Sequence, residues 1–214
     1  MPVTLDIWLA YAAATIVLLV IPGPTILTVI SYSLTHGRRA NVALVAGVAL
    51  GDSTALLLSL VGLGAVLAAS AALFTAVKWA GGLYLIYLGV KMLRGAAIAL
   101  PAQGQAPAVL ESHGRVFLNT WLVTALNPKG IIFFIAFLPQ FLRPGADVTA
   151  QLWVFAVTFV VLATVNAALY AIFAGSARRF LSTPRALRGF NVAGGTLLTA
   201  AGVWALLARR SGAS

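Results

Sequence analysis

Long apolar segments separated by short polar ones run along the chain from end to end. The pattern predicts six helices, each long enough to cross a bilayer core, which takes about 20 apolar residues. The predicted helices cover residues 5–34, 41–68, 72–93, 116–141, 149–177 and 189–208. This indicates an all-α polytopic membrane protein with a single transmembrane domain over residues 1–214.

Two of these six segments are interrupted by proline. Residues 7–35 contain no Asp, Glu, Lys or Arg, yet Pro22-Gly23-Pro24 breaks this run near its centre, and Asn127-Pro128-Lys129-Gly130 interrupts the fourth segment. Proline lacks a backbone N–H and leaves carbonyl groups unpaired. At membrane depth this is tolerated only where protein or a water-filled cavity satisfies those groups. Helices 1 and 4 are therefore predicted to be broken at proline, beside a binding site.

Several features recur with nearly constant spacing in the two halves of the chain. Ala80-Gly81-Gly82 with Gly89 returns 113 residues later as Ala193-Gly194-Gly195 with Gly202. The prolines of the two breaks are 104 residues apart, and Asp52 and Asn166 are 114 apart. We expect two three-helix repeats, residues 1–94 and 116–214, joined by a cytoplasmic linker over residues 95–115. An odd number of spans inverts the second repeat, as in many secondary transporters. The glycines are also compatible with close helix packing, as at Gly47-x-x-x-Gly51.

The composition supports a membrane protein and excludes several kinds of site. Hydrophobic residues make up 61% and charged residues 8% of the chain, whereas average domains have about 25% charged residues. The mean hydropathy is +1.01. Without cysteine there are no disulfides or Cys-based metal sites, and His36 and His113 fall in predicted loops, so no metal and no cofactor are expected.

The net charge of +10 is spread over the loops, which favours lipid contact and topology control over nucleic-acid binding. The odd-numbered loops hold nine cations and the other side holds four. By the positive-inside rule, the odd loops are cytoplasmic and both termini periplasmic. The nine are Arg38, Arg39, Lys91, Arg94, Arg115, Arg178, Arg179, Arg185 and Arg188, and the four are Lys78, Arg143, Arg209 and Arg210. Residues 178–188 are expected to form a basic loop.

The two breaks predict complementary hydrogen-bonding groups. Gly23 and Asn127 are suitable N-cap residues, each followed by a proline at the first helical position. Each new helix would then present free N–H groups and a partial positive charge. In an inverted repeat the two N-termini face each other and could hold a carboxylate. The carbonyls freed upstream, around residues 19–21 and 124–126, could accept bonds from an ammonium group. Such a site suits a zwitterion.

Two charges lie within the apolar segments, and such charges are candidates for function because they are costly there. One interpretation is a structural ion pair between Asp52 and Lys129. The other is that Asp52 binds a substrate amine or a proton, while Lys129 binds a carboxylate or neutralises Asp52. Burial disfavours a charged carboxylate, so Asp52 is the proton-coupling candidate. Asn127 and Asn166 either bind substrate or join helices. The candidate substrate-binding residues are Pro22, Gly23, Pro24, Thr25, Asp52, Asn127, Pro128, Lys129 and Asn166.

The sequence combines the two proline motifs, Pro22-Gly23-Pro24 and Asn127-Pro128-Lys129, with Gly37-Arg38-Arg39, Gly51-Asp52 and the segment from Lys78-Trp79 to Gly89. In this combination of motifs it resembles the LysE/RhtB family of amino-acid exporters. The resemblance covers nearly the whole chain. It implies a secondary-active exporter of amino acids or related small zwitterions in the bacterial inner membrane, driven by the proton-motive force. It also implies six hydrophobic segments and is compatible with a homodimer.

Other functions remain as alternatives. A metal-ion or other small-solute exporter of the same fold lacks a His, Cys or Asp cluster to support it. An intramembrane enzyme needs a nucleophile–base pair or metal cluster at depth, and the sequence offers little for either. The protein is therefore not expected to be an enzyme.

Overall fold

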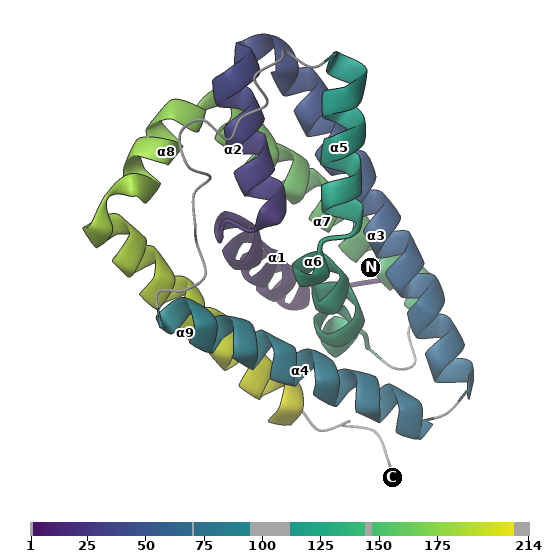
Figure 1. The fold of residues 1–214 in the computed structure, drawn as a ribbon. Helices are drawn as coiled ribbons and strands as arrows, with labels where there is room; N and C mark the ends of the chain where they lie inside the picture. The colour runs from purple at the N-terminus through teal and green to yellow at the C-terminus, as the bar shows by residue number, and fades with distance from the viewer. Residues whose placement is uncertain (1, 70, 95–111, 144–146, 208–214) are drawn as a thin grey trace.

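The computed structural model describes residues 2–69, 71–94, 112–143 and 147–207, and this part of the chain is helical with no strand. The α-helices are α1 (Leu5–Val20), α2 (Pro24–His36), α3 (Asn41–Ala69), α4 (Ala71–Leu93), α5 (His113–Ala125), α6 (Pro128–Ile132), α7 (Val148–Ile172), α8 (Ala174–Ser182) and α9 (Pro184–Leu207). Shorter helical turns are η1 (Gly37–Ala40), the π-helical η2 (Phe133–Phe137) and η3 (Leu138–Phe141). Figure 1 shows α4 and α9 side by side along one edge of the molecule.

Both predicted proline breaks are confirmed. The first ends α1 at Val20 and starts α2 at Pro24 with Gly23 as N-cap, and the second starts α6 at Pro128 with Asn127 as N-cap. Proline has no N–H to lose at the first helical position, so each break ends one helix and begins another.

Some predicted boundaries are wrong. The basic loop expected over residues 178–188 is helical, because α8 covers Ala174–Ser182 and α9 already begins at Pro184. Pro184 suits the first position of a helix, so it starts α9 rather than prolonging a loop. The helix expected from Val116 starts at His113, where the Ser112 side chain accepts a bond from the Arg115 N–H. Most of the predicted linker, residues 95–111, lies outside the described residues.

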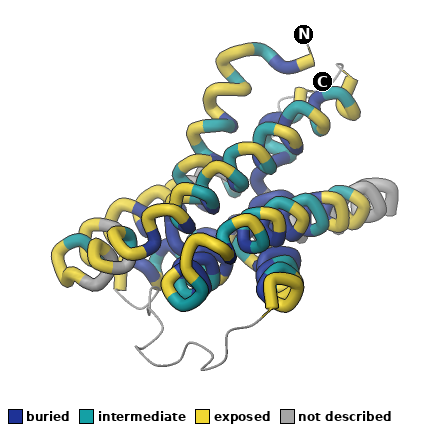
Figure 2. Tube along the Cα trace, turned by 90° about the horizontal axis from the view of Figure 1, so that it is seen from above, coloured by how far each residue is buried: buried dark blue, intermediate teal, exposed yellow. Residues whose placement is uncertain are grey.

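Helix α7 is apolar on its outward as well as its inward face. Outward, large side chains recur every fourth residue and are about half exposed or more: Trp153, Val157, Val161, Val165 and Leu169. Inward, the buried positions are Phe155, Phe159, Ala163, Ala167 and Ala171. A helix that is hydrophobic all round is typical of a membrane span. In Figure 2 the buried positions gather inside the crossing helices, and exposed ones follow their outer faces.

Three helical stretches in the described part of the chain are long and apolar enough to cross a membrane: Pro24–Gly62, His113–Phe141 and Val148–Ile172. Leu5–Val20 and Gly82–Leu93 are shorter apolar helices. The fold is thus consistent with a polytopic membrane protein. The number of six spans stays a prediction.

The glycines singled out in the sequence lie where helices touch. A Cβ atom placed on Gly195 would lie 2.7 Å from the Gly89 carbonyl oxygen, and one on Gly202 would lie 2.7 Å from that of Gly82. These pairs join α4 to α9 in antiparallel register. Likewise, a Cβ on Gly47 would lie 2.9 Å from the Phe117 carbonyl oxygen, where α3 meets α5. The predicted packing role of the glycines is confirmed.

Candidate functional site

The two proline breaks meet inside the molecule. The Asn127 side chain accepts a bond from the Lys129 N–H (3.1 Å) and so caps α6. Its Nδ2 also donates to the Thr25 Oγ1 in the first turn of α2, at 3.1 Å. A single buried amide therefore joins the starts of two helices that lie about a hundred residues apart in the sequence.

Side chains from other helices satisfy the carbonyls at the end of α1. The last carbonyls of a helix have no partner within the helix. Here the Lys129 Nζ donates to the carbonyl oxygens of Leu18 (2.9 Å) and Ile21 (2.8 Å). Two side chains of α7 complete the cap: the Asn166 Nδ2 donates to the Leu19 oxygen (3.1 Å) and the Tyr170 hydroxyl to the Val20 oxygen (2.8 Å). Four successive carbonyls are thereby paired.

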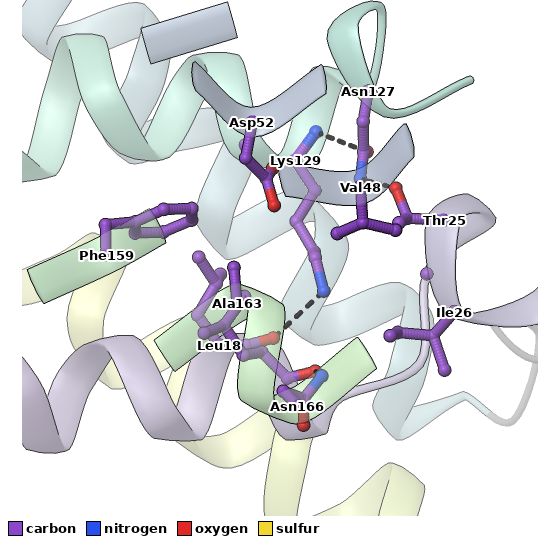
Figure 3. A pocket seen from close by; sticks show the side chains of 13 residues that line it. Leu18, Thr25, Ile26, Val48, Asp52, Asn127, Lys129, Phe159, Ala163 and Asn166 are labelled. Carbon is purple, nitrogen blue, oxygen red and sulfur yellow. Dashed lines mark hydrogen bonds between the residues drawn. The ribbon is translucent and has the colours of Figure 1, made fainter. Parts of the chain in front are cut away.

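A cavity lies at the meeting point of these elements (Figure 3). Its volume of about 30 Å³ is room for roughly two water molecules but not for an amino acid. It combines backbone and polar side chains with an apolar wall, and its lining residues are Leu18, Leu19, Gly23, Thr25, Ile26, Val48, Asp52, Asn127, Lys129, Gly130, Phe159, Ala163 and Asn166.

Asp52 is buried in this lining, with 7% of its surface exposed. Asp52 and Lys129 both lie in the described chain, yet they form no ion pair there, and the Lys129 ammonium is bonded to α1 instead. In Figure 3 this ammonium points to Leu18, away from the Asp52 carboxylate. The direct contact expected of an ion pair is therefore absent among the described residues, although the two charges still attract each other across the cavity. Asp52 has no hydrogen-bond partner among the described residues.

The predicted site residues divide into two groups. The structure brings Gly23, Thr25, Asp52, Asn127, Lys129 and Asn166 to one cavity. The prolines are not part of the lining: Pro22 is buried, Pro24 and Pro128 are exposed, and all three act on the site by ending or starting helices.

Sequence reasoning missed Tyr170 and the apolar wall formed by Ile26, Val48, Phe159 and Ala163. Tyr170 follows Asn166 by four residues and so shares its helix face. That spacing was a usable signal. The residues of the apolar wall could not be singled out, because apolar residues are common throughout this sequence.

The described residues contain no group of three His, Cys, Asp or Glu side chains that could hold a metal ion. The site instead offers one carboxylate, one ammonium group, two carboxamides and the backbone of two broken helices. These groups can bind a small molecule through hydrogen bonds and charge.

Comparison with known proteins places the chain in a family. A family model described as LysE type translocator matches residues 16–209. The chain belongs to the LysE-type translocator family. The motif resemblance is thus confirmed, and the protein is a membrane protein of a family of transporters rather than enzymes.

Several curated relatives match over long stretches. The homoserine/homoserine lactone efflux protein of Salmonella typhimurium is 34% identical over 209 residues, 97% of this chain and 100% of the relative. The leucine efflux protein of Klebsiella pneumoniae is 29% identical over 139 residues, 65% of each chain. An uncharacterized membrane protein of Vibrio cholerae is 29% identical over 199 residues, 93% of this chain and 96% of the relative. No solved structure matches the chain.

Proposed function

We propose that the protein exports amino acids or closely related zwitterions across the bacterial inner membrane by secondary active, proton-coupled transport. The observation that carries this proposal is the meeting of two broken helices at a charged cavity, in a chain of a translocator family. The substrate sits between the two breaks, Asp52 and Asn166. Homoserine and leucine, which the names of two relatives mention, are the first substrates to test.

The chemistry of the cavity supports a zwitterionic substrate. Helix α2 begins at Pro24 and α6 at Pro128, and a helix N-terminus favours a carboxylate. The carbonyls of α1 and the Asp52 carboxylate favour an ammonium group. Phe159 and Ala163 give the cavity an apolar side that a side chain could contact.

The packing of α4 against α9 supports two inverted repeats. Under the offset of 113 residues, Gly82 corresponds to Gly195 and Gly89 to Gly202. The contact between Gly82 and Gly202 then corresponds to the contact between Gly195 and Gly89, and both contacts are present. A two-fold relation between the halves gives this exchange, and alternating access follows by rocking one half against the other. The small cavity volume is that of a closed state.

Contacts at the helix ends support the way in which the charge pattern divides the segments between the two sides of the membrane. Asp6, near the N-terminus, forms an ion pair with Arg143 (3.7 Å), in the segment before α7. At the opposite predicted side, the Asn119 amide of α5 donates to the Tyr32 hydroxyl of α2 (2.6 Å), and α8 packs on α2. Each group of contacts joins segments that the charge pattern assigns to one side of the membrane.

The proposal is tested by counterflow in liposomes that contain the purified protein. Liposomes loaded with one unlabelled amino acid at a time should accumulate the matching labelled amino acid, and protein-free liposomes should not. Asn166→Ala should reduce the rate at least tenfold because it removes a polar group of the cavity. Val165→Ala, on the adjacent outward-facing position with 51% exposure, should not. Exchange of metal cations but of no amino acid by folded protein would overturn the proposal.

A further inference from the structure

The carbonyls that Lys129 occupies have the properties of a binding site for a cation. Helix α1 ends at Val20, so the oxygens of Leu18 and Ile21 lie at the negative end of its dipole. Both accept from one nitrogen, at 2.9 and 2.8 Å. A primary ammonium has three N–H donors. Lys129 uses two of them and has no third partner among the described residues.

Lys129 reaches this position from another part of the chain. Its backbone belongs to α6, directly after Asn127, and its side chain crosses the cavity to α1. It passes Gly23 so closely that a Cβ placed there would lie 3.4 Å from the Lys129 Cε and 3.5 Å from its Nζ. The ammonium is thus a tethered ligand that fills part of the cavity between the two breaks.

We propose that the Leu18 and Ile21 carbonyls form a binding site for a primary ammonium group, filled here by Lys129 and filled by the amine of the substrate during transport. The second half of this inference rests on the proposed function. When the substrate amine takes the carbonyls, Lys129 is released toward Asp52, which lines the same cavity, already attracts the Lys129 charge and has no hydrogen bond or salt bridge in the described chain. Every charge then keeps a partner, which a buried charge requires.

This exchange explains why the closed cavity is too small for an amino acid. Lys129 occupies the amine position and closes the space between α1 and α6. Binding of the amine removes the tether, and the two broken helices are then free to separate. The site would discriminate by N–H donors as well as by charge, because carbonyl oxygens bind an ammonium through directed hydrogen bonds.

The binding site can be tested in purified protein, without transport. Lys129→Ala empties the site down to the Cβ atom, and propylammonium replaces the missing atoms. We expect a lower Tm for Lys129→Ala than for the unsubstituted protein in detergent, and recovery of at least half of that loss with propylammonium chloride. Tetramethylammonium, which has no N–H, should not restore it. Lys91→Ala, which truncates an exposed lysine of α4, should show no recovery.

Equal recovery of Lys129→Ala with propylammonium and with tetramethylammonium would overturn the ammonium site. Equal effects of propylammonium on Lys129→Ala and Lys91→Ala would overturn it as well. If Lys129→Ala does not fold, a transport competition with the unsubstituted protein tests the exchange instead. Once counterflow of an amino acid is established, its α-hydroxy analogue, with a hydroxyl in place of the amine, should compete at least tenfold more weakly. Equal competition would overturn the exchange while leaving the exporter function intact. Absence of any counterflow, with propylammonium still rescuing Lys129→Ala, would overturn the proposed function but keep the site.

Discussion

At the scale of single residues, the carbonyl groups at the end of α1 show how a broken helix satisfies its hydrogen bonds. A buried carbonyl left without a partner costs about 1–3 kcal/mol, and a bond to a charged donor contributes about 1.5–3 kcal/mol. Lys129 supplies two such bonds, to Leu18 and Ile21. Withdrawing it without a replacement therefore costs several kcal/mol. This favours an exchange with the substrate amine over spontaneous opening of the empty cavity.

Asp52 is the residue at which we expect proton coupling. Its carboxylate is buried and makes no hydrogen bond or salt bridge in the described chain, so it can gain or lose a proton without breaking a direct protein contact. Asp52→Asn should abolish stimulation of amino-acid transport by a pH gradient in inverted vesicles, while the protein still inserts. The matched control is Asp6→Asn, whose carboxylate is exposed and pairs with Arg143. Normal pH-driven transport by Asp52→Asn would rule out the coupling role.

The sequence predicted which residues would gather at the site better than it predicted the hydrogen-bond partners of those residues. Proline chemistry is local, so both breaks and their N-caps followed from a few neighbouring residues. The partner of Lys129 is not local, because the oxygen of Ile21 lies 108 residues away. With Asp52 and a set of carbonyls both available, the sequence contains nothing that decides between them. The backbone geometry decides for the carbonyls.

At the scale of the helices, close approach of backbones replaces the hydrophobic effect as the reason for packing. Lipid tails are as apolar as leucine, so small residues that allow contact between backbones stabilise helix pairs. Gly82 and Gly89 on α4 meet Gly202 and Gly195 on α9. Periodic glycines are visible in a sequence, which made this contact predictable. Helix α8 was not predicted, because its basic residues resemble a loop when only charge is considered.

Two alanine substitutions in α9 separate packing from helix propensity. Gly202→Ala should destabilise the protein by about 1–3 kcal/mol, because its Cβ would meet the Gly82 carbonyl oxygen at 2.7 Å. Gly189→Ala lies in the same helix with no atom within 4 Å of the added Cβ, so it should be neutral or slightly stabilising. Thermal unfolding in detergent measures both. Equal behaviour of the two variants would argue against close contact of α4 and α9.

At the scale of the whole molecule, the direction of transport depends on which end of the molecule faces the cytoplasm. The charge pattern assigns nine loop cations to one side and four to the other. The Asp6–Arg143 pair joins two segments assigned to the periplasm. The pair agrees with this division of the segments, and the charge asymmetry favours the orientation in which the substrate would leave the cytoplasm through the end that carries His113 and Thr183.

The absence of cysteine from the sequence makes this orientation directly measurable, because any introduced cysteine is unique. We expect a membrane-impermeant maleimide to label Pro2→Cys and Thr149→Cys in intact spheroplasts. His113→Cys and Thr183→Cys should be labelled only after permeabilisation. None of these substitutions removes a lysine or arginine, so the charge bias that sets topology is unchanged. The reverse pattern would place both termini in the cytoplasm and leave the repeat intact. Labelling of Pro2→Cys and Thr183→Cys from the same side would rule out the inverted three-helix repeats, because an inversion needs an odd number of spans in each half.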